Sequence, residues 1–285
     1  YLIKSISSYI LGEALKHSLH LMLLQGSIIV NLINTRPLLS HISEFMTSTP
    51  TTFIVYGPFD IGRASQVELL KQYLPTNEII EPIFPRKQKV PFLSDLLKNA
   101  YTRTNRKVLP EEIGVFMSHR KIWRIIEKLD HNKHYLILES DSKLIDPTTL
   151  NEQFSIVEKS YDIFFWGAWN NHVSIKRSTK KKVNHGYRIG TPMIKSLYGT
   201  YGYSLNPAAA KYLLKQSKQI NHPVDYYKCY VNPNEVRLGA IQPEVVSTWQ
   251  TTESNVRVER PMDKIKRIII IKIFHLRNQI LAYFC

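Results

Sequence analysis

Apolar runs of strand length alternate with amphipathic segments of helical period along most of the chain. The predicted strands are Gly26–Ile33, Thr52–Tyr56, Glu78–Phe84, a run starting at Tyr135, Tyr161–Gly167 and Tyr198–Leu205. The predicted helices are Leu38–Met46, Ser65–Tyr73, Ser94–Tyr101, Glu111–Leu129, Glu152–Lys159 and a segment from Pro207 through Lys218 with Asn206 as its N-cap. Strands that alternate with helices predict an α/β fold.

The most informative pattern is the end of the run from Tyr135. The apolar segment Leu136–Leu138 is followed at once by Glu139-x-Asp141. Unpaired carboxylates cost several kcal/mol to desolvate, so acids at the end of a buried strand usually face a cleft or a cation. Two acids on alternate residues that hold Mg²⁺ or Mn²⁺ against a diphosphate would form a sugar-nucleotide site, and this pattern favours glycosyl transfer.

Length and composition allow one large domain or two small ones with a substantial core, since 44% of the 285 residues are hydrophobic. The two cysteines, Cys229 and Cys285, form neither a disulfide framework nor a CxxC metal motif, which suits a cytosolic location. No run reaches the ~18 apolar residues of a membrane span. Residues 1–25 are apolar but interrupted by charges, and they lack the layout of a cleavable signal.

The formal net charge is +15, and the positive charge is unevenly placed. Between Ile163 and Val224 there is no Asp or Glu but there are ten Lys and Arg, five of them within Lys176–Lys182. Such a field attracts nucleotide diphosphates, acidic lipid headgroups or nucleic acid. A solvated basic loop is the alternative interpretation of Lys180–Lys182.

The last segment, Pro261–Cys285, predicts a basic and strongly apolar helix. Helices of this kind lie in a membrane interface with their cations on anionic headgroups. The alternative is a helix packed on the core with its lysine stems along the surface.

Four motifs follow one another along the chain. The first is the helix Glu112–Trp123 with Gly114-x-x-x-Ser118-His119, and the second is Glu139-Ser140-Asp141. The third is Gly199-Thr200-Tyr201-Gly202-Tyr203, and the fourth is Pro223-Val224-Asp225. Together they resemble glycosyltransferase family 25, the lipopolysaccharide-biosynthesis glycosyltransferases, from about Gly26 to Gln250. The resemblance implies a single GT-A domain, a Rossmann-like α/β sheet, over 26–258. We expect a helical extension at 1–25 and the basic helix at 259–285.

The resemblance also implies inverting transfer of a hexose, most often galactose, from a UDP-sugar to a hydroxyl of a lipid-linked oligosaccharide. We expect a Mn²⁺ or Mg²⁺ cofactor, and a bacterial enzyme that is peripheral on the cytoplasmic face of the inner membrane. Besides the donor and the lipid-linked acceptor, we expect the protein to bind the anionic membrane surface through its C-terminal helix. We expect it to bind no nucleic acid.

Site residues are carried over by position from the family's motifs. The expected metal ligands are Asp141 and Glu139, with Glu139 alternatively on the ribose, and the expected base is Asp225, which could instead cap a helix from Tyr226. The expected donor-binding residues are Asn31, Leu32, Arg36, His119, Arg120, Glu139 and Ser140. The expected acceptor-binding residues are Tyr198, Thr200, Tyr201 and Gly202. His119 could equally be a buried structural histidine, and Arg120 a surface salt bridge.

Two departures from the family's pattern keep other functions open. Ser140 stands where the family's Glu-Asp-Asp has its middle acid, and Ile33 stands where an Asp commonly follows Asn-Leu. A catalytically lapsed relative that acts as a scaffold is therefore one alternative. A basic nucleic-acid-binding module is another, although no recognisable nucleic-acid motif is present.

Overall fold

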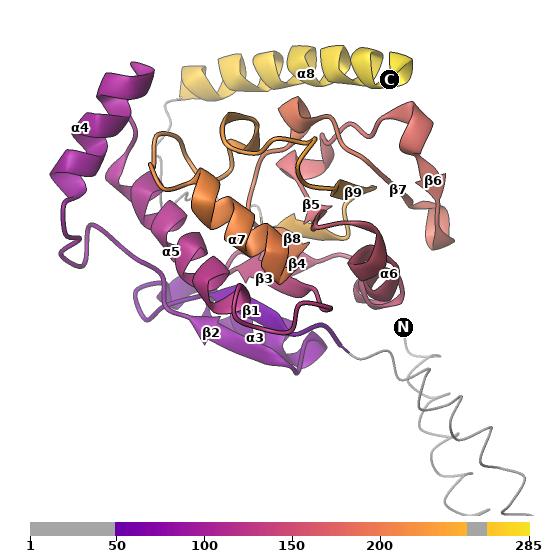
Figure 1. The fold of residues 1–285 in the computed structure, drawn as a ribbon, viewed down its shortest axis with the longest axis horizontal. Coiled ribbons are helices and arrows are strands. Elements are labelled where there is room, and N and C mark those ends of the chain that lie inside the picture. The colour runs from indigo at the N-terminus through magenta and orange to yellow at the C-terminus, as the bar shows by residue number, and fades with distance from the viewer. Residues whose placement is uncertain (1–48, 250–260) are drawn as a thin grey trace, which may run out of the picture. The chain divides into compact units, whose positions relative to one another are not determined.

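The computed structural model describes residues 49–249 and 261–285, which belong to one compact unit, Thr49–Cys285 (Figure 1). The strand predicted at Gly26–Ile33, the helix predicted at Leu38–Met46 and the donor residues Asn31, Leu32 and Arg36 lie outside the described residues, as do the proposed boundaries at 25 and 258. The chain that is described is a mixed α/β structure, which agrees with the predicted class.

The main sheet has eight strands in the order β2-β1-β3-β8-β5-β9-β7-β6. Their bounds are β1 Thr52–Val55, β2 Asn77–Ile80, β3 Tyr135–Glu139, β5 Ile163–Gly167, β6 Lys181–Lys182, β7 Arg188–Gly190, β8 Gly202–Leu205 and β9 Leu238–Gln242. Strand β1 pairs in parallel with β2 and β3, whereas β8 runs antiparallel between β3 and β5. A small antiparallel pair, β4 (Ser142–Leu144) and β10 (Val246–Thr248), lies beyond the end of β3.

The helices agree with the predicted pattern to within a few residues. They are α3 Ala64–Tyr73, α4 Leu93–Thr104, α5 Pro110–Ile126, α6 Pro147–Ser160, α7 Pro207–Gln216 and α8 Pro261–Phe284. Asn206 caps α7 as predicted, because its side chain accepts a hydrogen bond from the backbone N–H of Ala209. Helix α6 begins earlier than expected since Asp146 caps it in the same way through Thr149.

Two predicted strands are shorter in the structure. The run Glu78–Phe84 is extended only to Ile80, and Pro82, which has no N–H to donate, follows closely. The run Tyr198–Leu205 becomes strand only at Gly202. Residues before it leave the sheet, because Gly199 takes the left-handed conformation with φ of 89°.

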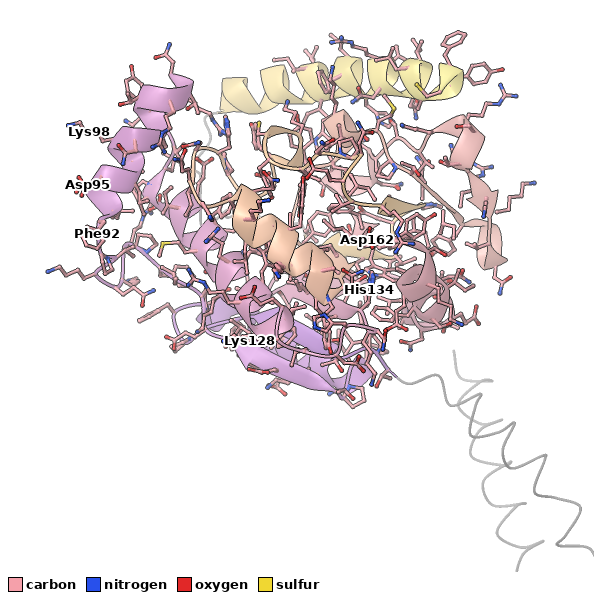
Figure 2. The ribbon with its side chains drawn as sticks, in the orientation of Figure 1. Phe92, Asp95, Lys98, Lys128, His134 and Asp162 are labelled. Carbon is pink, nitrogen blue, oxygen red and sulfur yellow. The ribbon has the colours of Figure 1, made fainter. Side chains whose placement is uncertain are left out.

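A polar network lies at the end of the sheet where strands β3 and β5 begin. His134 and Asp162, labelled in Figure 2, come just before these two strands. His134 is buried, and its Nε2 donates to the carbonyl of Tyr161 at 2.9 Å. Asp162 accepts hydrogen bonds from Arg237 and Asn206. These contacts satisfy buried polar groups at the edge opposite the acids of β3.

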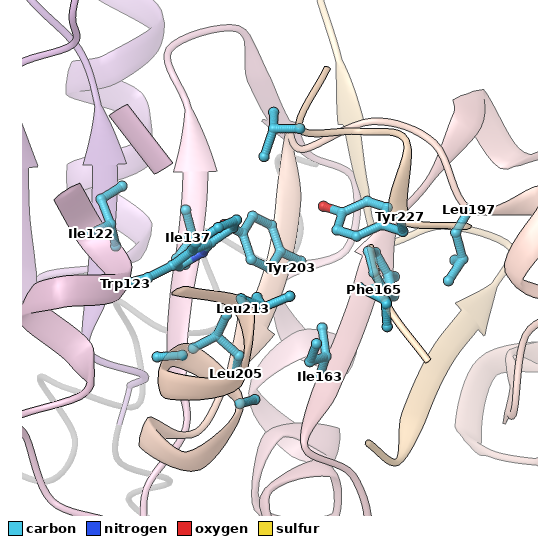
Figure 3. Packing of buried hydrophobic residues seen from close by; sticks show 14 of the residues in the cluster. Ile122, Trp123, Ile137, Ile163, Phe165, Leu197, Tyr203, Leu205, Leu213 and Tyr227 are labelled. Carbon is cyan, nitrogen blue, oxygen red and sulfur yellow. The ribbon is translucent and has the colours of Figure 1, made fainter. Parts of the chain in front are cut away.

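Alternate residues of the central strands point to two separate cores. One core holds Ile137, Tyr203 and Phe165 under helices α5 and α7, as Figure 3 shows with Trp123 and Leu213. The other core holds Leu136, Leu138 and Trp166 under helices α3 and α6. Because both faces are covered, the open positions of the sheet are its strand ends, and β1 and β3 bring their carboxyl ends to the same edge.

Candidate active site

The two predicted acids lie at the carboxyl end of β3, where they remain partly accessible. The side chain of Glu139 is 26% exposed and that of Asp141 is 23% exposed. The turn between them is held by Ser142, whose hydroxyl accepts from the backbone N–H of Glu139 at 2.9 Å and donates to the carbonyl of Tyr201. The strand end therefore presents both carboxylates beside the segment that leads into β8.

Glu139 is the point at which three of the sequence motifs meet. Its Oε1 lies 3.2 Å from Nε2 of His119, on helix α5, and accepts a hydrogen bond from Oγ1 of Thr200, just before β8. Burial alone would raise the pKa of Glu139. The hydrogen bond and charge interaction with His119, helped by Thr200 and Arg63, outweigh that effect and lower this pKa. Glu139 is thus held as a carboxylate.

A directed hydrogen-bond chain orients His119 behind Glu139. The indole N–H of Trp123 lies 2.9 Å from the hydroxyl of Tyr203, and that hydroxyl lies 2.8 Å from Nδ1 of His119. An indole N–H can only donate, so the Tyr203 oxygen accepts from it. The carboxylate of Glu139 can only accept, so Nε2 of His119 carries the hydrogen that faces it. His119 is fully buried, as the alternative of a buried structural histidine expects, and its predicted contact with the donor stays a prediction.

The Gly-x-x-x-Ser-His motif of α5 has a local explanation. A Cβ on Gly114 would lie 2.4 Å from the carbonyl oxygen of Ile83, so only glycine lets that segment approach the helix. One turn later, the hydroxyl of Ser118 donates to the carbonyl of Gly114 and accepts from the N–H of Ile83, both at 2.8 Å. The motif docks the chain that follows β2 on α5, and it sets the height of His119 on that helix.

A second polar cluster joins the ends of β1 and β3. Asp60 and Arg63 follow β1. Asp60 immediately precedes the short helix η1 (Ile61–Arg63), and Arg63 is its last residue. Ser140 donates its hydroxyl hydrogen bond to Asp60 and accepts one from Arg63 at 3.1 Å. Arg63 also lies 3.5 Å from carboxylate oxygens of both Asp60 and Asp141. Sequence reasoning missed Asp60 and Arg63. The signal available was their position in the loop after a parallel strand.

The surroundings of Asp141 disfavour the charged form of its carboxylate. Burial and the nearby charge of Glu139 raise the pKa of Asp141 to about 6, against the opposing effect of Arg63. Its Oδ1 is buried and accepts no hydrogen bond. A buried, unpartnered carboxylate oxygen next to a second carboxylate is suited to a hard cation, which would relieve both the desolvation and the repulsion.

The fit to a divalent cation is nevertheless incomplete. Within residues 49–249 and 261–285, no three Asp, Glu, His or Cys side chains gather closely enough to hold a metal ion by themselves. A cation at Asp141 and Glu139 would take its remaining oxygen ligands from the diphosphate and from water. Metal use stays a prediction on this basis.

Other predicted residues have well-defined contacts. Arg120 donates to the carbonyls of Leu214 and Ser217 at 3.2 and 2.6 Å, at the end of α7. Arginine near the C-terminus of a helix satisfies its last carbonyls, so this contact is structural. Its predicted contact with the donor stays a prediction.

The predicted acceptor tyrosines differ in exposure. Tyr201 is buried, and its hydroxyl donates to Glu244 at 2.8 Å. Tyr198 is partly exposed and lies in an aromatic cluster, with ring centroids 5.1 Å from Trp169 and 5.5 Å from Tyr226. Tyr198 is therefore the more accessible of these two predicted acceptor tyrosines.

Asp225 lies in the turn before the short helix η6 (Tyr227–Cys229), in which Tyr226 occupies the N-cap position. Burial first, then neighbouring charges that include Asp225 and Glu139, raises the pKa of Tyr227 well above its usual value.

A left-handed turn after β5 was not predicted. Trp169, Asn170 and Asn171 have φ values of 51°, 50° and 66°. The backbone N–H of Asn170 donates to the Tyr201 hydroxyl at 2.9 Å, and that of Asn171 donates to Glu244 at 2.8 Å. Strained backbone of this kind persists only where its surroundings over-determine it, and it clusters at functional sites. This turn places Trp169 beside Tyr198.

Comparison with known proteins agrees with this geometry. The model of glycosyltransferase family 25 (LPS biosynthesis protein) matches residues 76–228, more than half of the chain. That range contains His119, Glu139, Asp141, Thr200 and Asp225. No curated protein gives a significant match to the chain.

Proposed function

We propose, from the premise that this chain belongs to glycosyltransferase family 25, that it transfers a hexose from a UDP-sugar to a hydroxyl of a lipooligosaccharide or related glycan. Membership of the family supports glycosyltransferase activity in lipopolysaccharide biosynthesis. The observation that carries the proposal further is the convergence of His119 and Thr200 on Glu139, next to Asp141. A GT-A arrangement of the donor site and galactose as the sugar are parts of the same proposal.

The donor diphosphate is assigned to the edge formed by the ends of β1 and β3. Arg63 supplies a guanidinium there, and a carboxylate pair accompanies it. Asp141, with Glu139, would hold a Mn²⁺ or Mg²⁺ ion, which when bound neutralises charge on the leaving nucleotide diphosphate. Arg63 neutralises part of the same charge through the protein itself.

The transfer step is a single in-line displacement with inversion. The acceptor hydroxyl oxygen forms a bond to the anomeric carbon while the bond from that carbon to the diphosphate oxygen breaks, and the electron pair leaves with UDP. The hydroxyl proton goes to a carboxylate, for which Asp225 is the proposed base. Glu139 orients the donor, and His119 holds Glu139 in place. Tyr198 and the segment Thr200–Gly202 are proposed to line the acceptor side.

The departure at Ser140 does not by itself favour a lapsed enzyme. The serine hydroxyl bonds Asp60 and Arg63, so a carboxylate from the β1 loop lies beside the position at which the family commonly has its middle acid. Asp60, from the loop after β1, therefore stands beside Glu139 and Asp141, although the three acids do not gather closely enough to hold a metal ion by themselves. This arrangement supports an active enzyme over a scaffold.

The proposed place of action is the cytoplasmic face of a bacterial inner membrane, where a lipid-linked acceptor would be extended. None of the helices described in the structure is long and apolar enough to cross a membrane. Peripheral contact with the bilayer is part of the same proposal.

A panel of nucleotide-sugars tests the proposal. The full chain is incubated with UDP-galactose, UDP-glucose, UDP-N-acetylglucosamine and matched GDP- and CMP-sugars, with Mn²⁺, Mg²⁺ or chelator, and thermal stability and UDP release are recorded. We expect a UDP-sugar to raise the melting temperature, because a ligand that binds only the folded state stabilises it by mass action. No shift and no turnover with any donor would support the lapsed relative. Binding of oligonucleotides that weakens steeply with salt, with no donor binding, would support the nucleic-acid module.

A further inference from the structure

Helix α8 turns an apolar stripe away from the rest of the described structure. The stripe consists of Ile269, Ile273, Leu276, Ile280, Tyr283 and Phe284. At about 100° per residue, these six positions fall within roughly 50° of one line along the helix. Their exposure is high, with Ile273 at 65%, Leu276 at 60% and Phe284 at 81%. A continuous row of large exposed apolar side chains marks an interaction surface.

The opposite side of α8 is the side that packs on the protein. Asn278 and Ala282 are buried there. Nδ1 of His275 donates to the carbonyl of His172 at 3.0 Å, and the ring of Phe274 lies 6.1 Å from that of Trp169. The protein therefore fixes the rotation of the helix, so that the stripe faces outward.

Cations flank this stripe from two parts of the sequence. Lys272 and Arg277 are exposed on α8 itself. At its C-terminal end, the guanidinium of Arg177 lies 4.2 Å from the ring centroid of Tyr283, and the hydroxyl of Ser178 donates to the carbonyl of Cys285. The basic segment Lys176–Lys182 is thereby brought beside the stripe, with four of its five cations exposed.

We infer that α8, with the basic segment Lys176–Lys182, is a docking surface for an anionic phospholipid bilayer, on which the helix lies flat. The apolar stripe enters the headgroup boundary, and the flanking cations contact acidic headgroups. The spacing of Ile269, Ile273, Leu276 and Ile280 would also suit a coiled coil with a second copy. Charge decides between the two, because residues 264–285 contain no Asp or Glu to pair with Lys272 and Arg277 of a partner.

Vesicle flotation of the full chain tests this surface independently of catalysis, since no donor or glycan acceptor is present. We expect binding to vesicles of phosphatidylcholine with 30% phosphatidylglycerol, and at least tenfold weaker binding to phosphatidylcholine alone. Raising the salt from about 0.05 to 0.5 M should weaken binding to the anionic vesicles, because surface charges are screened.

Two sets of variants separate the apolar and the cationic contributions. Ile273→Ser with Ile280→Ser should lower vesicle affinity about tenfold or more without lowering the melting temperature, because both side chains are exposed. Lys272→Gln with Arg277→Gln should lower it by a similar factor on anionic vesicles only. The matched control, Lys211→Gln with Lys215→Gln on the exposed side of α7, should retain full binding.

Three results would overturn the inference. Equal loss of binding in the α7 control would assign the attraction to net charge instead of to this surface. Unchanged binding in the Ile273→Ser, Ile280→Ser variant would remove the stripe from the contact. A stable dimer by light scattering that the same variant dissociates, without vesicle binding, would assign the stripe to a second copy.

Discussion

Nε2 of His119 lies 3.2 Å from Oε1 of Glu139, which links helix α5 to the end of strand β3 inside the candidate site. The contact joins a histidine of the predicted helix Glu111–Leu129 to an acid at the end of the predicted strand from Tyr135. Behind it, Tyr203 holds the other nitrogen of the ring. The pair has a consequence for the pH dependence of the enzyme.

His119→Ala should lower kcat by about tenfold or more and move the acidic limb of the pH profile to higher pH. The reason is that the pKa of Glu139 loses the interaction that lowers it, so the carboxylate form is lost at a higher pH. His119→Gln, whose amide can still donate to Glu139, should recover much of the loss. A purely structural role for His119 predicts an unshifted pH profile in both variants.

Asp60 should act as the substitute for an acid at position 140. Asp60→Ser is expected to raise KM for the donor about tenfold, because Arg63 and Ser140 lose the carboxylate that orients them. Adding Ser140→Asp to that variant returns a carboxylate to the cluster from β3 and should restore donor binding. Initial-rate kinetics measure both variants, and a double variant no better than the single one contradicts this role.

Gly114→Ala should destabilise the fold by about 1–3 kcal/mol, because the added Cβ would clash with the backbone carbonyl of Ile83, which cannot move aside as a flexible side chain could. Gly62→Ala is the matched control, since a Cβ at Gly62 meets nothing within 4 Å. Urea denaturation of both variants measures the difference. A cost for Gly114→Ala equal to that of Gly62→Ala would show that the close approach does not matter.

The buried His134 should make the fold sensitive to acid. Burial lowers the pKa of His134 to about 4, against the opposing hydrogen bond to Tyr161 and charge of Asp162. The unfolded chain, with a histidine pKa near 6.5, binds more protons between these values, so stability present above about pH 6.5 is lost as pH falls toward 4. The loss is about 3 kcal/mol at most, because one pKa unit corresponds to ~1.4 kcal/mol.

Urea midpoints between pH 7 and pH 4.5 measure this effect. His134→Gln should flatten the decline toward acid, at the cost of a lower stability at neutral pH. His131→Gln, which removes an exposed histidine from the loop before β3, serves as the matched control. An unchanged slope in His134→Gln would assign the acid sensitivity to other groups.

Helices with a strong period and a good first turn were predictable from local sequence. Helix α5 was expected at Glu111–Leu129 and spans Pro110–Ile126, and α7 begins at its predicted cap. The short strands β4, β6, β7, β9 and β10 were not predicted. They have two to five residues each, and tertiary pairing decides whether so few residues form a strand.

The site was predictable to the extent that its residues lie in motifs. Glu139, Asp141, His119 and Thr200 were chosen from sequence, and the structure brings Glu139 together with all but Asp141 by direct hydrogen bonds. Asp60 and Arg63 were missed because no local pattern shows that the loop after β1 folds against the end of β3. The parallel register of these two strands creates that contact.

Donor turnover by Asp141→Ala tests the central claim most directly. Single-turnover UDP release is measured for this variant beside wild type and Asp95→Asn, an exposed acid on α4. We predict loss of turnover by Asp141→Ala with an unchanged melting temperature, because the substitution removes a carboxylate whose ionised form burial disfavours. Full turnover by Asp141→Ala would contradict the assignment of the donor site to the end of β3.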